Sequence, residues 1–217
     1  MDYAAARFNM VEGQIKPNKV TNFALLNAMA NIPRELFVPA SARGIAYVDE
    51  DIRIADGRYL VEPMVLARLI DHAAIEPGDI VLDIGCGTGY SSAVLGKLAS
   101  AVVAVESDPD LAARATELLP QIGVDNAVVV EGALREGYPG QAPYQAILIN
   151  GSVAEVPESL TDQLADGGRL VVVVADRDGV GRATLYQRTG RALSRRALFD
   201  ASTPYLPGFE PKPAFQF

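Results

Sequence analysis

From residue 75 onward, short apolar runs alternate with stretches of helical periodicity. The runs are rich in Val, Ile, Leu and Ala and cover residues 80–82, 101–106, 127–131, 146–150 and 169–175. Helices are predicted between them at residues 91–99, 108–119 and 157–164. A regular alternation of strand and helix predicts an open sheet whose strands are mainly parallel. After the last run, residues 183–189 and 192–200 flank Gly190 and predict an antiparallel hairpin.

The first 75 residues have a different pattern, in which prolines interrupt the helical stretches. Residues 3–15 have helical periodicity, and a second helix is predicted at residues 23–30 with Thr21 or Asn22 as its N-cap. Pro63 suits the first turn of a third helix at 64–73, where its missing N–H has no cost. We therefore expect a single domain over residues 1–217, which consists of an N-terminal helical elaboration (1–75), a Rossmann-like core (76–201) and a proline-rich tail (202–217).

Composition and charge exclude several classes of function. A chain of 217 residues that is 49% hydrophobic can bury the core of one α/β domain. Its net charge of −8 argues against a nucleic-acid partner, which would favour a basic surface. The single cysteine cannot form an internal disulfide and fits a reducing compartment. With one cysteine and one histidine, Cys/His catalysis and metal sites are poorly supplied, so no metal is expected.

The sequence predicts neither export nor insertion into a membrane. Residues 1–4 lack the basic region and apolar core of a signal peptide. The longest apolar runs, such as residues 170–175, are far shorter than a bilayer-spanning helix needs. We expect a cytoplasmic protein with no membrane partner.

Three closely spaced glycines follow the first apolar run. That run leads into one acidic residue and three alternating glycines, Asp83, Gly85, Gly87 and Gly89. A buried strand that passes through a glycine-rich turn into a helix is how open α/β sheets form nucleotide sites. A dinucleotide fingerprint, Gly-x-Gly-x-x-Gly, would place its third glycine at Tyr90. The observed spacing instead resembles the cofactor loop of class I S-adenosylmethionine-dependent methyltransferases.

An acidic residue also ends the second strand. Glu106 follows Gly85 by 21 residues. A carboxylate about twenty residues after the first loop glycine, at a strand end, can accept hydrogen bonds from ribose hydroxyls. The loop and Glu106 together indicate an adenosine-type cofactor, and S-adenosylmethionine is the one we expect.

Four other segments occur in order along the chain, at residues 10–15, 33–39, 46–49 and 163–171. As a set they resemble protein-L-isoaspartate O-methyltransferases over about residues 8–175. Residues 33–39, Pro-Arg-Glu-Leu-Phe-Val-Pro, are the most specific part, because a generic methyltransferase does not require them. The resemblance implies an α/β fold with a class I methyltransferase Rossmann-like sheet. That sheet would have seven strands, mostly parallel with an antiparallel last strand, with helices on both faces and an N-terminal helical extension.

The resemblance also implies a reaction. Members of this family transfer a methyl group from S-adenosylmethionine to the side-chain carboxylate of isoaspartyl residues, which is a step of protein repair. A carboxylate is already ionised at pH 7 and the sulfonium methyl is already electrophilic. Catalysis then consists mainly of alignment and exclusion of water, so few specialised side chains are needed.

The chain departs from the family's pattern in the loop before the third helix. Where the family has Thr-Ile-Ser-Gln-Pro, residues 59–63 read Tyr-Leu-Val-Glu-Pro. Val61 cannot form a hydrogen bond through its side chain. Glu62 would repel an isoaspartyl carboxylate by roughly 4 kcal/mol at about 4 Å and an effective dielectric near 20. Val61 and Glu62 are the positions that we assign to acceptor contact and catalysis.

Two more departures follow the third and fourth strands. The family's Gly-Asp-Gly is Gly132-Ala133-Leu134 here, and loss of the adenine-side aspartate would cost about 1–3 kcal/mol of cofactor binding. The fourth strand ends in Asn150-Gly151-Ser152 rather than Thr-Ala-Ala, so Asn150 and Ser152 are also candidates for acceptor contact. Cys86 is interpreted as a small residue in a tight turn rather than as a nucleophile. The residues that we expect at the cofactor are Asp83, Gly85, Cys86, Gly87, Gly89, Tyr90, Glu106, Ser107, Gly132, Ala133 and Asn150.

Three interpretations remain open at this point. The chain is an isoaspartate methyltransferase with an altered acceptor loop, or a methyltransferase on the same scaffold with another acceptor. In the second case Glu62 could serve as general base for a hydroxyl or an amine. The third is a non-catalytic homologue that binds the cofactor. The expected partner is a polypeptide or small-molecule methyl acceptor, and the expected state is a monomer or a homodimer.

Overall fold

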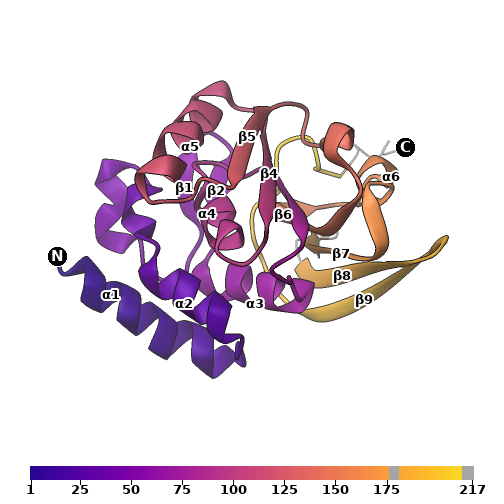
Figure 1. Ribbon diagram of the computed structural model, residues 1–217. Helices are drawn as coiled ribbons and strands as arrows, with labels where there is room; N and C mark the ends of the chain where they lie inside the picture. Colours follow the sequence, from indigo (N-terminus) through magenta and orange to yellow (C-terminus); the bar gives the residue numbers. More distant parts are fainter. Residues whose placement is uncertain (176–180, 212–217) are drawn as a thin grey trace, which may run out of the picture.

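The computed structural model describes residues 1–175 and 181–211 (Figure 1). Its centre is a seven-stranded sheet with the strand order β5-β4-β3-β6-β7-β8-β9. The strands are β3 (Ile80–Ile84), β4 (Ala101–Glu106), β5 (Ala127–Glu131), β6 (Tyr144–Val153), β7 (Leu164–Ala175), β8 (Gly181–Thr189) and β9 (Ala192–Asp200). Of the predicted tail, residues 212–217 lie outside the described residues.

The strand directions agree with the predicted sheet. Strands β3 to β7 pair in parallel, whereas β8 is antiparallel to both of its neighbours, β7 and β9. The chain crosses from β5, at one edge, to β6 on the other side of β3. The carboxyl ends of β3 and β6 therefore flank a topological switch point, where open α/β sheets bind ligands.

Alternate residues of the strands face two separate hydrophobic cores. Val81 belongs to the first core, and its neighbours Leu82 and Ile84 belong to the second. Helices that contribute to the first core are α1 (Tyr3–Met10), α2 (Phe23–Asn31), α3 (Pro63–Ala73), α4 (Tyr90–Gly96) and α5 (Pro109–Gln121). The second core is covered by the short helix α6 (Glu158–Thr161) and by Leu206 and Phe209 of the tail. Within the described parts of the chain, no helix has the length and apolar character that a bilayer span requires.

Two parts of the predicted secondary structure were wrong. The helix expected at residues 157–164 is only α6, and Leu164 already begins β7, because it pairs with Tyr144 ahead of a bulge in the ladder. A two-stranded antiparallel hairpin of β1 (Ile52–Ala55) and β2 (Arg58–Leu60) was missed. Its turn, Asp56-Gly57, is a strong hairpin signal, but the strands are too short for a clear hydrophobic alternation.

Candidate functional site

The glycine loop connects β3 to α4 and has a backbone that only glycine adopts easily. Gly85, Gly87 and Gly89 have φ angles of +70°, +57° and +96°. This left-handed region is disfavoured for residues with a Cβ atom. The N–H of Gly85 donates to the carbonyl of Val105 at 2.8 Å, which joins the loop to β4. The loop therefore lies where the sequence predicted it, at the carboxyl end of β3.

Asp83, near the end of β3, stabilises this loop through hydrogen bonds to α4 and β6. Its side chain is fully buried and accepts hydrogen bonds from Ser91 Oγ at 2.7 Å, Ser92 Oγ at 2.6 Å and Asn150 Nδ2 at 2.6 Å. Burial raises the pKa of the Asp83 carboxyl to about 6, against the lowering effect of these three donors, and the charge of Glu106 raises it further. Asp83 thus ties β3 to α4 and to β6, and both of its oxygens are engaged within the protein.

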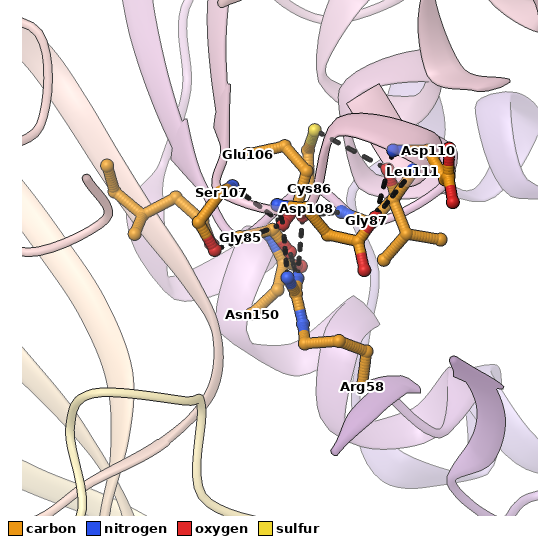
Figure 2. Close-up of polar contacts among 11 residues, drawn as sticks. Arg58, Gly85, Cys86, Gly87, Glu106, Ser107, Asp108, Asp110, Leu111 and Asn150 are labelled. Carbon is orange, nitrogen blue, oxygen red and sulfur yellow. Dashed lines mark hydrogen bonds and ion pairs between the residues drawn. The ribbon is translucent and has the colours of Figure 1, made fainter. Parts of the chain in front are cut away.

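Glu106 lies at the end of β4 and is the centre of the polar network in Figure 2. The guanidinium of Arg58, which comes from the β1–β2 hairpin, makes two contacts with it: Nη1 donates to Oε1, and Nη2 donates to Oε2 at 2.7 Å. Three backbone N–H groups also donate to this carboxylate, those of Gly87 at 2.7 Å, Ser107 at 2.7 Å and Asp108 at 3.0 Å. The side chains of Arg58 and Glu106 are only 4% and 0% exposed.

Cys86 and Tyr90 are packing residues in this arrangement. Cys86 is buried against Ala104 and Ala115, and burial raises the pKa of its thiol well above the ordinary value, so the thiolate is disfavoured. Tyr90 is fully buried, and its ring meets that of Phe37 edge to face at 5.4 Å. The guanidinium of Arg34 lies 4.7 Å from the centre of the Tyr90 ring.

The remaining predicted cofactor positions gather around the ends of β4, β5 and β6. Gly132 follows β5 and donates its N–H to the carbonyl of Glu106 at 2.9 Å. Ala133 is exposed beside it, and Ser107 directly follows Glu106. Asn150 donates to the carbonyl of Ile84 at 3.1 Å as well as to Asp83. The structure thus brings the predicted positions together, and their contacts with a cofactor remain predictions.

Three side chains bind the backbone of the loop before α3. Arg34, which is fully buried, donates from Nη2 to the carbonyl of Val61 and from Nε to that of Ala46, both at 2.8 Å. Asp51 accepts from the N–H of Glu62 at 3.0 Å, and Asp49 accepts from that of Met64 at 2.9 Å. These side chains fix the backbone of the loop.

Val61 and Glu62 differ in their surroundings. The Val61 side chain is 4% exposed and packs in the first hydrophobic core. The Glu62 side chain is partly buried beside other carboxylates. Burial raises the pKa of Glu62 to about 7, and the charges of Asp49, Asp51 and Glu50 add to this effect. Of the two residues, only Glu62 has a side chain that is partly accessible.

Sequence reasoning missed the residues that connect distant segments. Arg58, Arg34 and Asp51 were not singled out, although Arg34 lies in the Pro33–Pro39 segment that carried the resemblance. The Asp56-Gly57 turn would have indicated the hairpin but not the direction of Arg58. Among the described residues, no three His, Cys, Asp or Glu side chains are grouped in a way that could hold a metal ion.

Comparisons with known proteins agree on one family. The family model described as protein-L-isoaspartate(D-aspartate) O-methyltransferase matches residues 6–205. A protein-L-isoaspartate O-methyltransferase from Methanoculleus marisnigri is 42% identical over 185 residues, which are 85% of this chain and 84% of that protein.

Two solved structures have the same fold. A protein-L-isoaspartate O-methyltransferase aligns with a TM-score of 0.81 at 26% identity, over 93% of this chain and 66% of its own. A Plasmodium falciparum protein described as a putative protein-L-isoaspartate O-methyltransferase, in complex with S-adenosyl-L-homocysteine, aligns with a TM-score of 0.77 at 21% identity. That alignment covers 92% of this chain and 97% of the other.

Proposed function

Because this chain belongs to the protein-L-isoaspartate O-methyltransferase family of S-adenosylmethionine-dependent enzymes, we propose that it methylates the side-chain carboxylate of isoaspartyl residues in damaged proteins. The observation that carries the proposal is the position of Glu106 beside the glycine loop. The carboxylate and the loop lie together at the carboxyl ends of β4 and β3, next to the switch point of the sheet.

The residue types at this place fit S-adenosylmethionine. The Glu106 carboxylate is the acceptor that a ribose diol needs, and the loop glycines carry no Cβ atom of their own that would obstruct a ligand. The hydrogen bond between Asp83 and Asn150 fixes the start of the loop to β6. When bound, the cofactor supplies an electrophilic methyl group. The protein's part is to hold Glu106 and the loop in place and to exclude water from the reacting atoms.

We assign the contact with the acceptor to Glu62, which stands where the family has glutamine. With its pKa raised to about 7, a large fraction of Glu62 is protonated at neutral pH. A protonated carboxyl can donate a hydrogen bond to an isoaspartyl carboxylate, where an ionised one would repel it. The same property also suits a second candidate function, methylation of a hydroxyl or an amine, because a general base works best when its pKa lies near the working pH.

Methyl transfer to an isoaspartyl peptide, measured beside the same peptide with a normal aspartyl residue, distinguishes these functions. Transfer to the isoaspartyl peptide alone supports the first. If neither peptide is methylated while a panel of hydroxyl and amine acceptors is, the second function replaces the first. Turnover by the Glu62→Gln variant adds a check, since a general base at this position would be lost and a hydrogen-bond donor would be kept.

Charge and the single cysteine indicate the partner and the compartment of the protein. A net charge of −8 supports a protein partner rather than a nucleic acid. The one cysteine is buried and free, which fits a reducing compartment such as the cytoplasm. A monomer or homodimer is proposed, and light scattering at several protein concentrations tests it.

A further inference from the structure

Side chains from outside the Rossmann-like core lie directly on the glycine loop. Arg58 reaches the loop from the hairpin and donates from Nη2 to the carbonyl of Gly85 at 3.0 Å, in addition to its two contacts with Glu106 (Figure 2). These partners are 27 and 48 residues away in the sequence. The guanidinium therefore donates to both oxygens of the carboxylate that a ribose would use.

Two apolar side chains cover the glycines themselves. A Cβ atom built on Gly85 would lie 2.8 Å from Cδ1 of Leu206, and one built on Gly87 would lie 2.6 Å from Cδ1 of Ile54. Both distances are shorter than a carbon–carbon contact. The space that glycine leaves at these positions is thus filled by the chain's own side chains.

The tail segment that carries Leu206 is fixed to β6. Ser152 donates its N–H to the carbonyl of Pro204 at 2.9 Å, and Leu206 donates its N–H to the carbonyl of Ser152 at 2.9 Å. A Cβ atom on Gly151 would lie 3.0 Å from Cβ of Leu206, so the backbones approach closely there. The tail therefore runs beside the carboxyl end of β6, where Tyr205 forms a parallel bridge with Ser152.

Little room remains between the hairpin, the end of β6 and the tail. The cavity lined by residues 57–59, 150–151 and 203–206 has a volume of about 10 Å³. A single water molecule needs roughly 10–15 Å³ and a bound organic ligand roughly 300–1,000 Å³. The space between the hairpin and the tail therefore holds a single water molecule at most.

Glu106 has no hydrogen-bonding capacity left in this arrangement. An ionised carboxylate has about four acceptor positions. Here Oε1 accepts from Arg58, Ser107 and Asp108, and Oε2 accepts from Arg58 and Gly87. A ribose diol could bind only after the two Arg58 contacts were released.

We propose that Ile54, Arg58 and Leu206 form an internal plug that competes with S-adenosylmethionine for the glycine loop and Glu106. The inference rests on the proposed function, because it takes this site as the cofactor site. The plug holds the protein in a closed form, and cofactor binding requires the hairpin and the tail to move away. The apparent affinity for the cofactor is then reduced by the fraction of molecules that are open.

Calorimetric titration with S-adenosylhomocysteine, a stable cofactor product, tests the plug on the full chain. The variants are Arg58→Gln, which removes the two-point contact with Glu106, and Leu206→Ala, which uncovers Gly85 and leaves the ion pair intact. The control is Arg53→Gln, on the same hairpin, whose side chain is 63% exposed and pairs with Asp56 at the surface. If a tenth of the molecules or fewer are open, Arg58→Gln should bind at least about tenfold more tightly than the wild type, and Arg53→Gln should match the wild type.

Hydrogen exchange in the unmodified protein gives a second measurement that does not depend on how a variant folds. The Leu206 amide should be protected in the free protein, and its exchange should accelerate when S-adenosylhomocysteine is added. Protection that is unchanged in the saturated complex would overturn the plug.

The outcomes separate the plug from the proposed function. If wild type, Arg58→Gln and Leu206→Ala bind equally well, the plug is overturned and the methyltransferase function stands. If both variants bind and the wild type does not, the plug is supported. The wild-type chain is then inactive until the plug leaves the glycine loop. If none of the three binds at millimolar concentration, both the plug and the proposed cofactor are overturned.

Discussion

The carboxylate of Asp83 on β3 accepts a hydrogen bond from the side-chain amide of Asn150 on β6, with a distance of 2.6 Å between Oδ1 and Nδ2. The same amide donates to the carbonyl of Ile84 at 3.1 Å. This pair links the two strands that flank the switch point, where the chain leaves one half of the sheet and begins the other. Asp83 is fully buried, and the hydrogen bond from Asn150 offsets part of the cost of burying its charge.

Asp83→Asn should change the pH dependence of stability. The pKa of Asp83 is raised from 3.8 to about 6, so the native state binds the proton more tightly than the unfolded chain. The contribution of Asp83 to stability is thus fully present below pH 3.8 and is lost as the pH rises through 6. The loss is about 3 kcal/mol.

Urea unfolding of the wild type and of Asp83→Asn at about pH 4 and about pH 8 measures this effect. The variant should gain about 2.5 kcal/mol relative to the wild type between the two conditions. Asp56→Asn, whose side chain is fully exposed, is the control and should follow the wild type. Parallel curves for wild type and Asp83→Asn would contradict the prediction.

Arg34→Ala should destabilise the fold strongly. The change leaves the buried carbonyls of Ala46 and Val61 without their donor and removes the contact with the Tyr90 ring. Each unpaired buried group costs about 1–3 kcal/mol, so a total loss of roughly 3 kcal/mol or more is expected in urea unfolding. Arg114→Ala, at an exposed ion pair on α5, should change stability by less than about 1 kcal/mol. Similar losses for the two variants would show that Arg34 does not hold the loop.

Glu62 should make the binding of an anionic acceptor depend on pH. Its pKa near 7 means that the side chain is mainly neutral below that pH and mainly charged above it. The KM for an isoaspartyl peptide should therefore rise as the pH passes from about 6 to about 8, because repulsion grows as Glu62 ionises.

The Glu62→Gln variant should have a flatter KM profile over the same range, since an amide does not ionise. Glu117→Gln, at an exposed position on α5, should keep the profile of the wild type. If Glu62→Gln retains the full rise, another group titrates and Glu62 does not face the acceptor.

Gly89→Ala should disturb the start of α4. The φ angle of Gly89 is +96°, and a Cβ atom there would lie 3.1 Å from Cβ and 3.4 Å from Cα of Ala115 on α5. The strain should cost about 1–3 kcal/mol in thermal or urea unfolding. Gly13→Ala is a matched control in a helical segment, since a Cβ atom there has no neighbour within 4 Å. It should be neutral or stabilising by about 0.5–1 kcal/mol. Equal effects at both positions would exclude backbone strain as the cause.

Much of the sheet could be predicted from local pattern. Strands β4, β5 and β9 have the predicted bounds, because an apolar β-branched run or a hairpin glycine marks each of them. Asn22 caps α2 as expected, accepting from the N–H of Leu25 at 3.2 Å. The region around β7 could not be predicted, because its first pair, Leu164 with Tyr144, depends on a contact with another strand.

The sequence by itself determined the elements of the candidate site. The spacing of Gly85, Gly87 and Gly89 after an apolar strand, and the position of Glu106, are local properties that specify a turn and a strand end whatever surrounds them. The same holds for the resemblance in the Pro33–Pro39 segment, which depends on residue order alone.

Only the tertiary structure decided what lies on that loop. Arg58 meets Glu106 across 48 residues, and Leu206 reaches Gly85 from the tail. Neither contact has a periodicity or a spacing that a sequence can display, because a long side chain can point in many directions from a short strand. Because both side chains of the Arg58–Glu106 pair are buried, either charge would be costly without the other, so burial favours this pairing.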